Sequence, residues 1–443
     1  MSGSAQQVVE ALSRELRPPL TSQEALLEAD RCLGCGGPYA QPPCATACPA
    51  EIDVAGFIGA LAVGDRLGAA RTIFAENLLG GSCARVCPVE VLCEGACVLE
   101  HEGSRPIQIG ALQRYATDAA LLTGEPTVFR VVAPSSDRRV AVVGAGPAGM
   151  VCAGELATLG HAVTVFDEHP EPGGLVRYAI APYREQSEPL PAEAAALEAL
   201  GVEFRLGKPV DPAELETADA VFLAVGMGPD TDVRYPGDEL PGVWRSLPFI
   251  EAVKSGHPPD VGRDVFVIGG GNTAIDVARE ALRLGAELVT LVYRRTRAAM
   301  PAYSYEVDEA EAEGVRFLWL VEPVRFHGAQ RLEAVEWRLM SLGEPDESGR
   351  GRPEPVAGSE FTLRADTVVE AIGQRSRMEL ADWIPGVEFE HGALKVDPET
   401  GQTGNPRFFA GGDVTSGGAS VVQAVREGKR AAHAIDRWLA CAR

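Results

Sequence analysis

The sequence predicts an α/β protein in which an α-helical N-terminal domain precedes two Rossmann-like nucleotide-binding domains. From Arg139 onward, apolar strand segments alternate with glycine turns and helical segments, as in parallel sheets. A strand, a glycine-rich turn and a helix follow one another twice, at VAVVGAGPAGM and VFVIGGGNTAI. Eight of the ten cysteines lie between Cys32 and Cys97, in a segment with helical periodicity.

Composition narrows the functional classes. The formal net charge is −23 and the pI is near 4.8, so an acidic surface would repel nucleic acid. No apolar run reaches the roughly 18–20 residues of a membrane-spanning helix. The N-terminal MSGSAQQVVEALSREL has no signal-peptide pattern. We therefore expect a cytoplasmic protein without membrane or nucleic-acid partners.

The helical domain has an identifiable first helix. Thr21 followed by Glu24 forms a capping box, which predicts a helix running into the first cysteines. AGFIGALAVGDRLGAARTIFAEN and IQIGALQRYATDAALL continue the helical pattern. The predicted divisions are a helical domain over 1–122, a linker over 123–138, a first nucleotide domain over 139–235 and 361–443, and a second over 236–360. The strand-like segments ADAVFLAVGMG and ADTVVEAIGQ are both assigned to the first nucleotide domain.

The first glycine turn has the complete dinucleotide-binding pattern. Gly144, Gly146 and Gly149 allow, in order, a tight turn, close approach of a pyrophosphate and close helix–strand packing. The next strand ends at Asp167, where a carboxylate can accept hydrogen bonds from ribose hydroxyls. Strand, helix and acid agree, so this segment predicts a dinucleotide site.

The second turn has the same pattern with a different second strand. Gly269, Gly271 and Ala274 form G-x-G-x-x-A, and the following strand ends in Arg294 and Arg295 instead of an acid. Guanidinium groups bind a 2′-phosphate, which a carboxylate would repel. This favours NADPH over NADH, unless both arginines only pair with surface acids.

A third glycine segment lies near the C-terminus. RFFAGGDVTSGGASVV places Gly412 and Asp413 between a strand and a helix, which suits another contact to an extended cofactor. Together with GAGPAG, VTVFDE, PGGL, GGGNTAIDVA, YRRT and AIGQ, it resembles the two-dinucleotide flavoprotein family that includes thioredoxin reductase.

This resemblance implies two cofactor sites. The residues implied for FAD are Gly144, Gly146, Pro147, Ala148, Gly149, Asp167, Gly174, Leu175, Gly412 and Asp413. Those implied for NADPH are Gly269, Gly271, Asn272, Thr273, Ala274, Arg294, Arg295 and Gly373. Disulfide reductases of that family also need a cysteine pair beside the flavin. This chain has no cysteine between Cys152 and Cys441, so its electrons must leave by another route.

The N-terminal cysteines supply that route. Their spacing is C-x2-C-x8-C-x3-C-P, then C-x3-C-P-x5-C-x3-C, and such thiolates can bind either zinc or iron–sulfur clusters. A disulfide framework is disfavoured in a reducing compartment. Because flavin can convert a hydride into single electrons, two [4Fe–4S] clusters are the preferred interpretation.

RCLGC…CATACPAEIDV, CARVCPVEVLCEGAC and PIQIGALQRYATD resemble the small subunit of NADPH-dependent glutamate synthase and the flavin-bearing part of dihydropyrimidine dehydrogenase. The resemblance implies interleaved ligands. The first cluster would be held by Cys32, Cys35, Cys44 and Cys97. The second would be held by Cys48, Cys87, Cys93 and Gln113, with Cys83 as a spare thiol.

The expected function is an electron-input subunit. NADPH, FAD and the two clusters would pass electrons to a partner, with a glutamate synthase large subunit as first candidate. A dihydropyrimidine dehydrogenase catalytic subunit, or ferredoxin for a self-contained oxidoreductase, are the alternatives. The seven histidines show no arrangement for a hydrolase.

Overall fold

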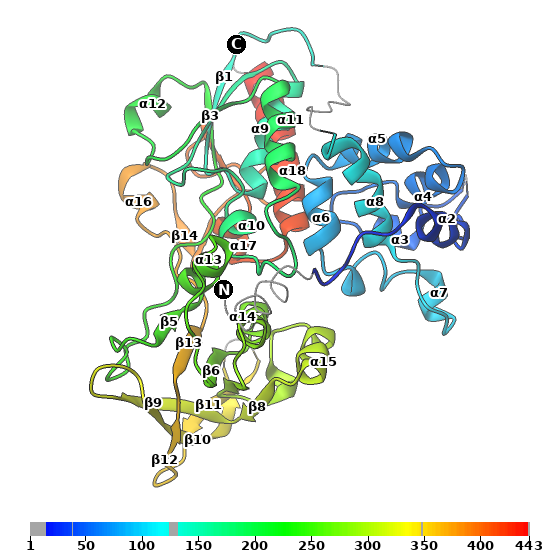
Figure 1. Ribbon diagram of the computed structural model, residues 1–443. Coiled ribbons are helices and arrows are strands. Elements are labelled where there is room, and N and C mark those ends of the chain that lie inside the picture. The colour runs from blue at the N-terminus through cyan, green and yellow to red at the C-terminus, as the bar shows by residue number, and fades with distance from the viewer. Residues whose placement is uncertain (1–14, 38, 124–131, 347–348, 442–443) are drawn as a thin grey trace. The chain divides into compact units, whose positions relative to one another are not determined.

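The computed structural model describes residues 15–37, 39–123, 132–346 and 349–441. The chain forms two compact units, which are described separately. The first unit includes Tyr178–Gln186 and Gly228–Arg375. The second comprises Arg17–Arg177, Ser187–Met227 and Ser376–Arg443. Figure 1 shows the elements of both units.

The second unit begins with a helical domain. Its helices are α2 Ser22–Asp30, α3 Pro43–Thr46, α4 Val54–Ala62, α5 Arg66–Glu76, α6 Gly80–Val86, the 3-10 turn η1 Val89–Val91, α7 Val98–His101 and α8 Ile109–Leu121. The predicted capping box is confirmed, because Thr21 Oγ1 accepts from Glu24 N at 3.2 Å and Thr21 N donates to the Glu24 carboxylate at 2.8 Å. Asp53 and Asp65 cap α4 and α5 by accepting from Gly56 N and Gly68 N, without the reciprocal bond of a capping box. Local side-chain caps therefore fix where several of these helices begin.

The rest of the second unit is a parallel sheet with helices. The sheet order is β16-β4-β1-β2-β3. The strands are β1 Arg139–Val143, β2 Ala162–Phe166, β3 Glu203–Arg205, β4 Ala220–Leu223 and β16 Phe408–Ala410, and β14 Phe389–Glu390 pairs with β15 Ala393–Leu394. The helices are α9 Pro147–Thr158, α10 Leu175–Tyr178, α11 Leu190–Ala199, α12 Pro212–Glu216, α16 Leu380–Trp383, α17 Asp413–Ser416 and α18 Val421–Cys441. Helices α9 and α18 lie side by side, and a Cβ at Gly428 would meet Ala148 O at 2.3 Å.

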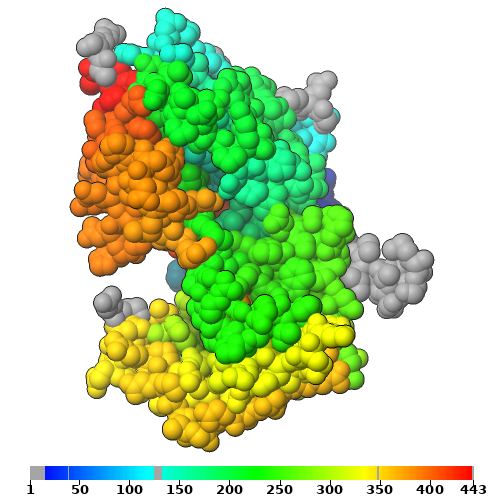
Figure 2. All heavy atoms as spheres, turned by 90° about the vertical axis from the view of Figure 1, so that its left-hand side faces the viewer, coloured from blue at the N-terminus to red at the C-terminus, as the bar shows by residue number. Residues whose placement is uncertain are grey.

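The first unit contains the other parallel sheet, in the order β5-β13-β6-β7-β8, and a small antiparallel sheet. The strands are β5 Val243–Arg245, β6 Asp264–Gly269, β7 Leu288–Tyr293, β8 Arg316–Trp319, β9 Val321–His327, β10 Ala334–Pro345, β11 Gly351–Pro355, β12 Phe361–Arg364 and β13 Thr367–Ala371. The helices are α13 Ser246–Lys254, α14 Asn272–Arg283, the 3-10 turn η2 Arg297–Ala299 and α15 Ser304–Glu313. In Figure 2 the yellow atoms around β9–β11 form a continuous surface of this unit.

The structure corrects one strand assignment. The segment ADTVVEAIGQ, predicted for the first nucleotide domain, forms β13, which pairs in parallel with β5 and β6 of the second. All five β13 residues are buried, and a short buried apolar run fits the centre of either sheet. The second domain therefore extends over Gly228–Arg375 instead of 236–360. The predicted linker over 123–138 lies largely outside the described residues, because 124–131 are not described.

The short segment Tyr178–Gln186 also belongs to the first unit. The Tyr183 hydroxyl donates to Asp276 Oδ1 on α14 at 2.6 Å, and Arg184 Nη2 forms ion pairs with Asp276 at 2.7 Å and Glu306 at 2.9 Å. These buried charges are paired, which satisfies the usual requirement for burying them. In the described part of the chain, no helix is long and apolar enough to cross a membrane.

Candidate functional site: two dinucleotide loops and two cysteine groups

The first glycine loop is shaped for a phosphate. Gly144 ends β1 with φ +106°, and a Cβ there would lie 2.2 Å from Ala224 O. A Cβ at Gly149 would lie 1.9 Å from Gly144 O, so helix α9 can approach the strand only with glycine at this position. At Gly146 the nearest atom to an added Cβ is 3.9 Å away. Gly146 therefore leaves the backbone open to a ligand at the N-terminus of α9, whose amide groups favour an anion.

Asp167 fixes this loop from the neighbouring strand. Its Oδ2 accepts from Ala145 N at 2.7 Å, and its Oδ1 accepts from His169 N at 2.9 Å. Each carboxylate oxygen has two lone pairs, so the group can still accept from a ribose hydroxyl. The acid therefore lies against the loop, and its contact with a ribose remains a prediction.

The C-terminal glycine segment meets the same loop. A Cβ at Gly412 would lie 2.9 Å from the Ala148 side chain, and one at Gly174 would lie 2.8 Å from Gly146 Cα. Burial raises the pKa of Asp413, which follows Gly412 at the start of α17. The structure thus brings together predicted FAD residues that lie far apart in the sequence. Pro147 and Ala148 begin α9, and Leu175 begins α10.

The second glycine loop repeats the geometry at the end of β6. A Cβ at Gly269 would meet Ala371 O at 2.2 Å, whereas one at Gly271 would meet no atom within 4 Å. Asn272, Thr273 and Ala274 form the first turn of α14, and Asn272 Oδ1 accepts from Tyr303 N at 3.0 Å. This loop also presents an open backbone at a helix N-terminus.

The two arginines after β7 differ in their exposure to solvent. Arg294 is exposed. Arg295 is only 6% exposed, and its guanidinium donates to Asp346 Oδ2 at 2.6 Å and to Gly351 O at 3.0 Å. Arg295 therefore already has an acidic partner in this structure, and Arg294 is the arginine open to a ligand. Gly373, another predicted NADPH residue, follows β13, and its carbonyl accepts from Thr231 N at 2.7 Å.

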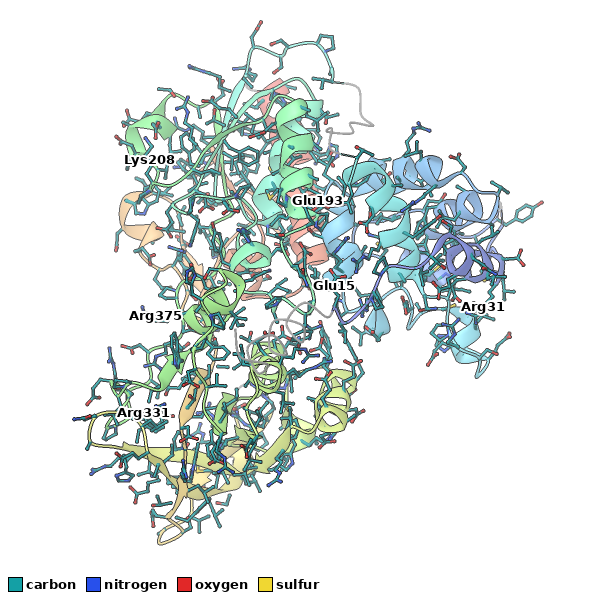
Figure 3. The ribbon with its side chains drawn as sticks, viewed as in Figure 1. Glu15, Arg31, Glu193, Lys208, Arg331 and Arg375 are labelled. Atoms are coloured by element: carbon teal, nitrogen blue, oxygen red, sulfur yellow. The ribbon has the colours of Figure 1, made fainter. Side chains whose placement is uncertain are left out.

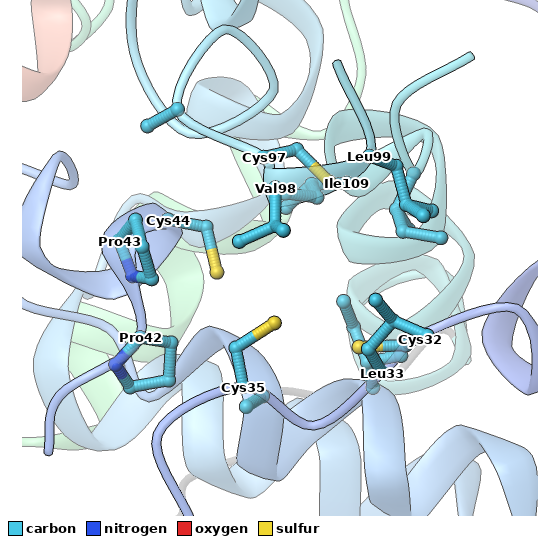
Figure 4. A pocket seen from close by; sticks show the side chains of 14 residues that line it. Cys32, Leu33, Cys35, Pro42, Pro43, Cys44, Cys97, Val98, Leu99 and Ile109 are labelled. Atoms are coloured by element: carbon cyan, nitrogen blue, oxygen red, sulfur yellow. The ribbon is translucent and has the colours of Figure 1, made fainter. Parts of the chain in front are cut away.

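The first predicted cysteine set lines one pocket. Cys32, Cys35, Cys44 and Cys97 surround a space of about 400 Å³, part of it open to solvent. Figure 4 shows their side chains around a common space. Cys44 lies in α3 and Cys97 is the N-cap of α7, so two short helices place these thiols. Burial, with smaller contributions from the neighbouring Cys32 and Cys97 thiols, raises the pKa of Cys44 to about 11.

The second cysteine group lies around helix α6. The pKa of Cys87 is raised well above its ordinary value, first by a hydrogen bond with the Cys83 thiol and then by burial, with Cys93 and Cys48 adding to it. Burial raises the pKa of Cys48, while hydrogen bonds from the backbone of Ile52, Ala50 and Glu51 lower it. Cys48, Cys87 and Cys93 are therefore neighbours, with Cys83 among them.

Gln113 lies on α8 beside α6. It is buried, and its Nε2 donates to Gly80 O at 2.7 Å, which leaves its Oε1 as the atom available to a metal. Two buried glutamates near these groups have no motif by which sequence reasoning could select them. Glu94 follows Cys93 and accepts from Gly110 N at 2.9 Å, and burial raises its pKa to about 7. Glu193 reaches α6 from α11.

The cysteine thiols form a donor set that suits iron–sulfur clusters, and the same kind of thiolate also binds zinc. Four thiolates around one zinc ion lie about 3.8 Å apart, given a zinc–sulfur bond of about 2.3 Å. Within the described ranges, no group of three or more His, Cys, Asp or Glu residues is arranged to hold a single metal ion. An iron–sulfur cube is larger than one ion and needs four ligands around an open space, and four cysteines line the pocket in Figure 4.

Comparison with known proteins agrees with this organisation. Residues 138–428 match the family described as pyridine nucleotide-disulphide oxidoreductase, and residues 9–125 match dihydropyrimidine dehydrogenase domain II, 4Fe-4S cluster. FprA from Mycobacterium tuberculosis in complex with NADPH has a TM-score of 0.58 at 23% identity, covering 70% of this chain and 86% of that chain, which supports the fold alone.

The chain is thus an NAD(P)H-dependent oxidoreductase of the flavin and iron–sulfur class, with FAD, NADPH and [4Fe–4S] clusters as cofactors. It is 39% identical to the glutamate synthase [NADPH] small chain of Halomonas elongata over 96% of this chain and 93% of that protein. The small chain of Escherichia coli is 36% identical over the same shares. The chain belongs to the glutamate synthase [NADPH] small-chain family.

Proposed function

We propose that this chain takes electrons from NADPH and delivers them to a larger catalytic subunit, most simply the large subunit of a glutamate synthase. The observation that supports it best is the arrangement within the second unit, where a dinucleotide loop and two groups of cysteines occur in one compact body. Relatives that cover nearly the whole chain are named as small chains of that enzyme.

The proposed roles follow from the geometry above. For FAD, the open backbone at Gly146 receives the pyrophosphate, Asp167 receives the ribose, and the Gly412–Asp413 turn adds a contact from the C-terminal segment. For NADPH, Gly271 takes the same role as Gly146, and Arg294 faces the 2′-phosphate. Arg295 supports that position through its bond to Asp346 and is the weaker phosphate candidate.

The cysteine groups keep their predicted assignment in this proposal. Cys32, Cys35, Cys44 and Cys97 hold one cluster, and Cys48, Cys87, Cys93 and Gln113 hold the other. Backbone N–H groups directed at the Cys48 sulfur help to set the second cluster's potential.

When bound, these cofactors convert the hydride of NADPH, two electrons and one proton, into two single electrons, leaving NADP⁺ and a proton. The chain's own part is to hold and orient the groups. It carries no disulfide-exchange pair, since Cys152 is buried in α9 and Cys441 lies on α18. A thioredoxin-reductase type of reaction is therefore not proposed.

A second candidate partner is a dihydropyrimidine dehydrogenase catalytic subunit, favoured by the match of residues 9–125 to a domain of that enzyme. Free ferredoxin is the third. We place the protein in the cytoplasm, because cluster thiolates need a reducing compartment and all ten cysteines are free.

The test is anoxic purification from the native host with analysis of bound flavin, iron and sulfide. A copurifying large chain and NADPH oxidation that depends on 2-oxoglutarate and glutamine support the proposal. A smaller FMN protein that reduces uracil identifies the second candidate. Rapid ferredoxin reduction by the isolated chain identifies the third. Zinc without sulfide would contradict all of them.

A further inference from the structure

Helix α6 joins the cysteine-bearing domain to the flavin-type domain inside the second unit. Its residues Gly80 to Arg85 are buried, Cys83 lies in its middle, and Cys87 is its C-cap. The approach is close, because a Cβ at Gly81 would lie 2.7 Å from Leu121 and 2.9 Å from Pro189. A single short helix thus contacts the sheet domain at one end and presents a proposed cluster ligand at the other.

The first turn of α6 lacks a cap of its own. Its N-cap residue is Leu79, which offers no side-chain acceptor, although the first amides of a helix need one. Glu193 on α11 supplies it from the other domain. Glu193 Oε1 accepts from Gly81 N at 2.8 Å and from Ser82 N at 3.1 Å, and its Oε2 accepts from Ser82 Oγ at 2.6 Å.

Glu193 is completely buried, and Figure 3 shows it where α11 faces α6. Another polar contact between these domains, among the described residues, is the ion pair of Lys429 with Glu76, whose side chains are 18% and 40% exposed. Exposed ion pairs contribute little, whereas charge-assisted hydrogen bonds in a buried place are strong and directional. Glu193 is therefore the polar contact best able to fix the position of α6.

The carbonyls of the same turn are also hydrogen-bonded, one by a side chain of α8 and one by a side chain of α6 itself. The carbonyl of Gly80 accepts from Gln113 Nε2 at 2.7 Å, and that of Gly81 accepts from Arg85 Nη1 at 3.1 Å. A shift of this turn would consequently move Gln113 as well as Cys87 at the far end of the helix. Glu193 thus acts on two proposed ligands of the second cluster without touching either.

We infer that Glu193 is a positioning residue that latches α6 to the flavin domain and thereby sets the rate at which electrons pass from the flavin to the second cluster. The inference rests on the proposed function, because it assumes that FAD and the second cluster occupy their proposed sites. Its consequence is that the transfer of electrons from the flavin to the second cluster is sensitive to Glu193, while the reduction of the flavin by NADPH is not.

The experiment uses the reconstituted full chain in anoxic stopped flow. Flavin bleaching by NADPH and the later bleaching of the clusters are followed separately in wild type, Glu193→Gln and Glu193→Ala. Glu198→Gln and Glu198→Ala are the matched controls, since Glu198 is an exposed carboxylate on the same helix. Iron content and the EPR signal and potential of the second cluster are measured for every variant.

Glu193→Ala should slow cluster bleaching by about tenfold, which corresponds to a rise of about 1.4 kcal/mol in activation free energy. Glu193→Gln keeps an acceptor for the two amides and should fall between Ala and wild type, with a shifted potential of the second cluster because the capping of α6 is altered. Flavin bleaching should stay unchanged in both, and the Glu198 controls should match wild type.

Wild-type cluster bleaching in Glu193→Ala would overturn the inference. If that variant does not fold, an unchanged rate and potential in Glu193→Gln would overturn it. Equal slowing of flavin and cluster bleaching would also overturn it, because the residue would then be only structural. Failure of the proposed function is recognised earlier, as wild-type protein without sulfide or without cluster bleaching.

Discussion

Gly271→Ala separates cofactor binding from folding at the second dinucleotide loop. An added Cβ meets no atom within 4 Å, and the residue has φ −90°, which alanine adopts freely. Alanine is a poorer N-cap than glycine by about 0.5–1 kcal/mol, but it restricts the unfolded chain and so returns about 0.4–1 kcal/mol. The net change in the free energy of unfolding is therefore close to zero.

The affinity for NADPH, in contrast to the stability, should fall. The methyl group occupies the face through which a pyrophosphate reaches the backbone amides, and each hydrogen bond to such a charged group contributes about 1.5–3 kcal/mol. Loss of one corresponds to a rise of about 10- to 100-fold in the Kd for NADPH. Titration of the anoxic protein measures it, with FAD content, iron content and a Tm within about 2 °C of wild type as controls.

Gly269→Ala is the contrasting variant. Its Cβ would lie 2.2 Å from Ala371 O, so it should lower the Tm instead of acting on binding alone. An unchanged Kd for NADPH in Gly271→Ala, with the fold intact, would refute the assignment of this loop to the nicotinamide cofactor.

The remaining predictions concern charge, metal and pH. Arg294→Ala should raise the KM for NADPH far more than the KM for NADH, without loss of stability. Arg295→Ala should also lower the Tm, because Asp346 loses its buried partner. Steady-state kinetics with both coenzymes measures these effects, and equal effects on both coenzymes would exclude a phosphate contact. Cys97→Ala should reduce iron from about eight to about four per chain with FAD retained; retention of all the iron would remove Cys97 from the ligands. Burial raises the pKa of Glu280 to about 8, and both its oxygens lack hydrogen-bond partners among the described residues. Between the ordinary glutamate pKa of 4.5 and about 8 the folded state keeps a proton that the unfolded chain releases, so this group makes stability fall as pH rises. Glu280→Gln should remove that decline and stabilise the chain at pH 8 by on the order of 2 kcal/mol, and identical urea-unfolding curves at pH 5.5 and 8 for wild type and variant would contradict it.

The fold class could be predicted because its signals are local. The loops at Gly144 and Gly269 each combine a strand, a tight turn and a helix within a few residues, and the comparisons confirm the two-dinucleotide fold. The placement of β13 could not be predicted in this way. A buried strand such as Val368–Val369 carries the same apolar pattern in either sheet, and only its hydrogen-bonded neighbours decide.

In the candidate site, too, local sequence signals could be predicted and contacts between distant segments could not. Cysteine spacing and the resemblance together predicted a set whose members the structure gathers into one pocket. The role of Glu193 could not be predicted, because its sequence context is that of an acid on a surface helix and only the folded chain places α6 against it. The pairing of Arg295 with Asp346 could not be predicted either. Asp346 follows β10, and no sequence pattern indicates that the end of β10 lies beside the end of β7.

The edge position of β16 has a consequence for how the protein is made. The ribosome releases the Gly144 loop early, but its sheet is finished only when Phe408–Ala410 pairs with β4 and α18 covers α9. Until then, the surface of α9 around Ala148, which Gly412 and Gly428 later approach closely, is uncovered. The nascent chain must therefore carry an incomplete flavin domain through the synthesis of the entire nicotinamide domain. The flavin domain can therefore complete its sheet only after Phe408–Ala410 has been synthesised.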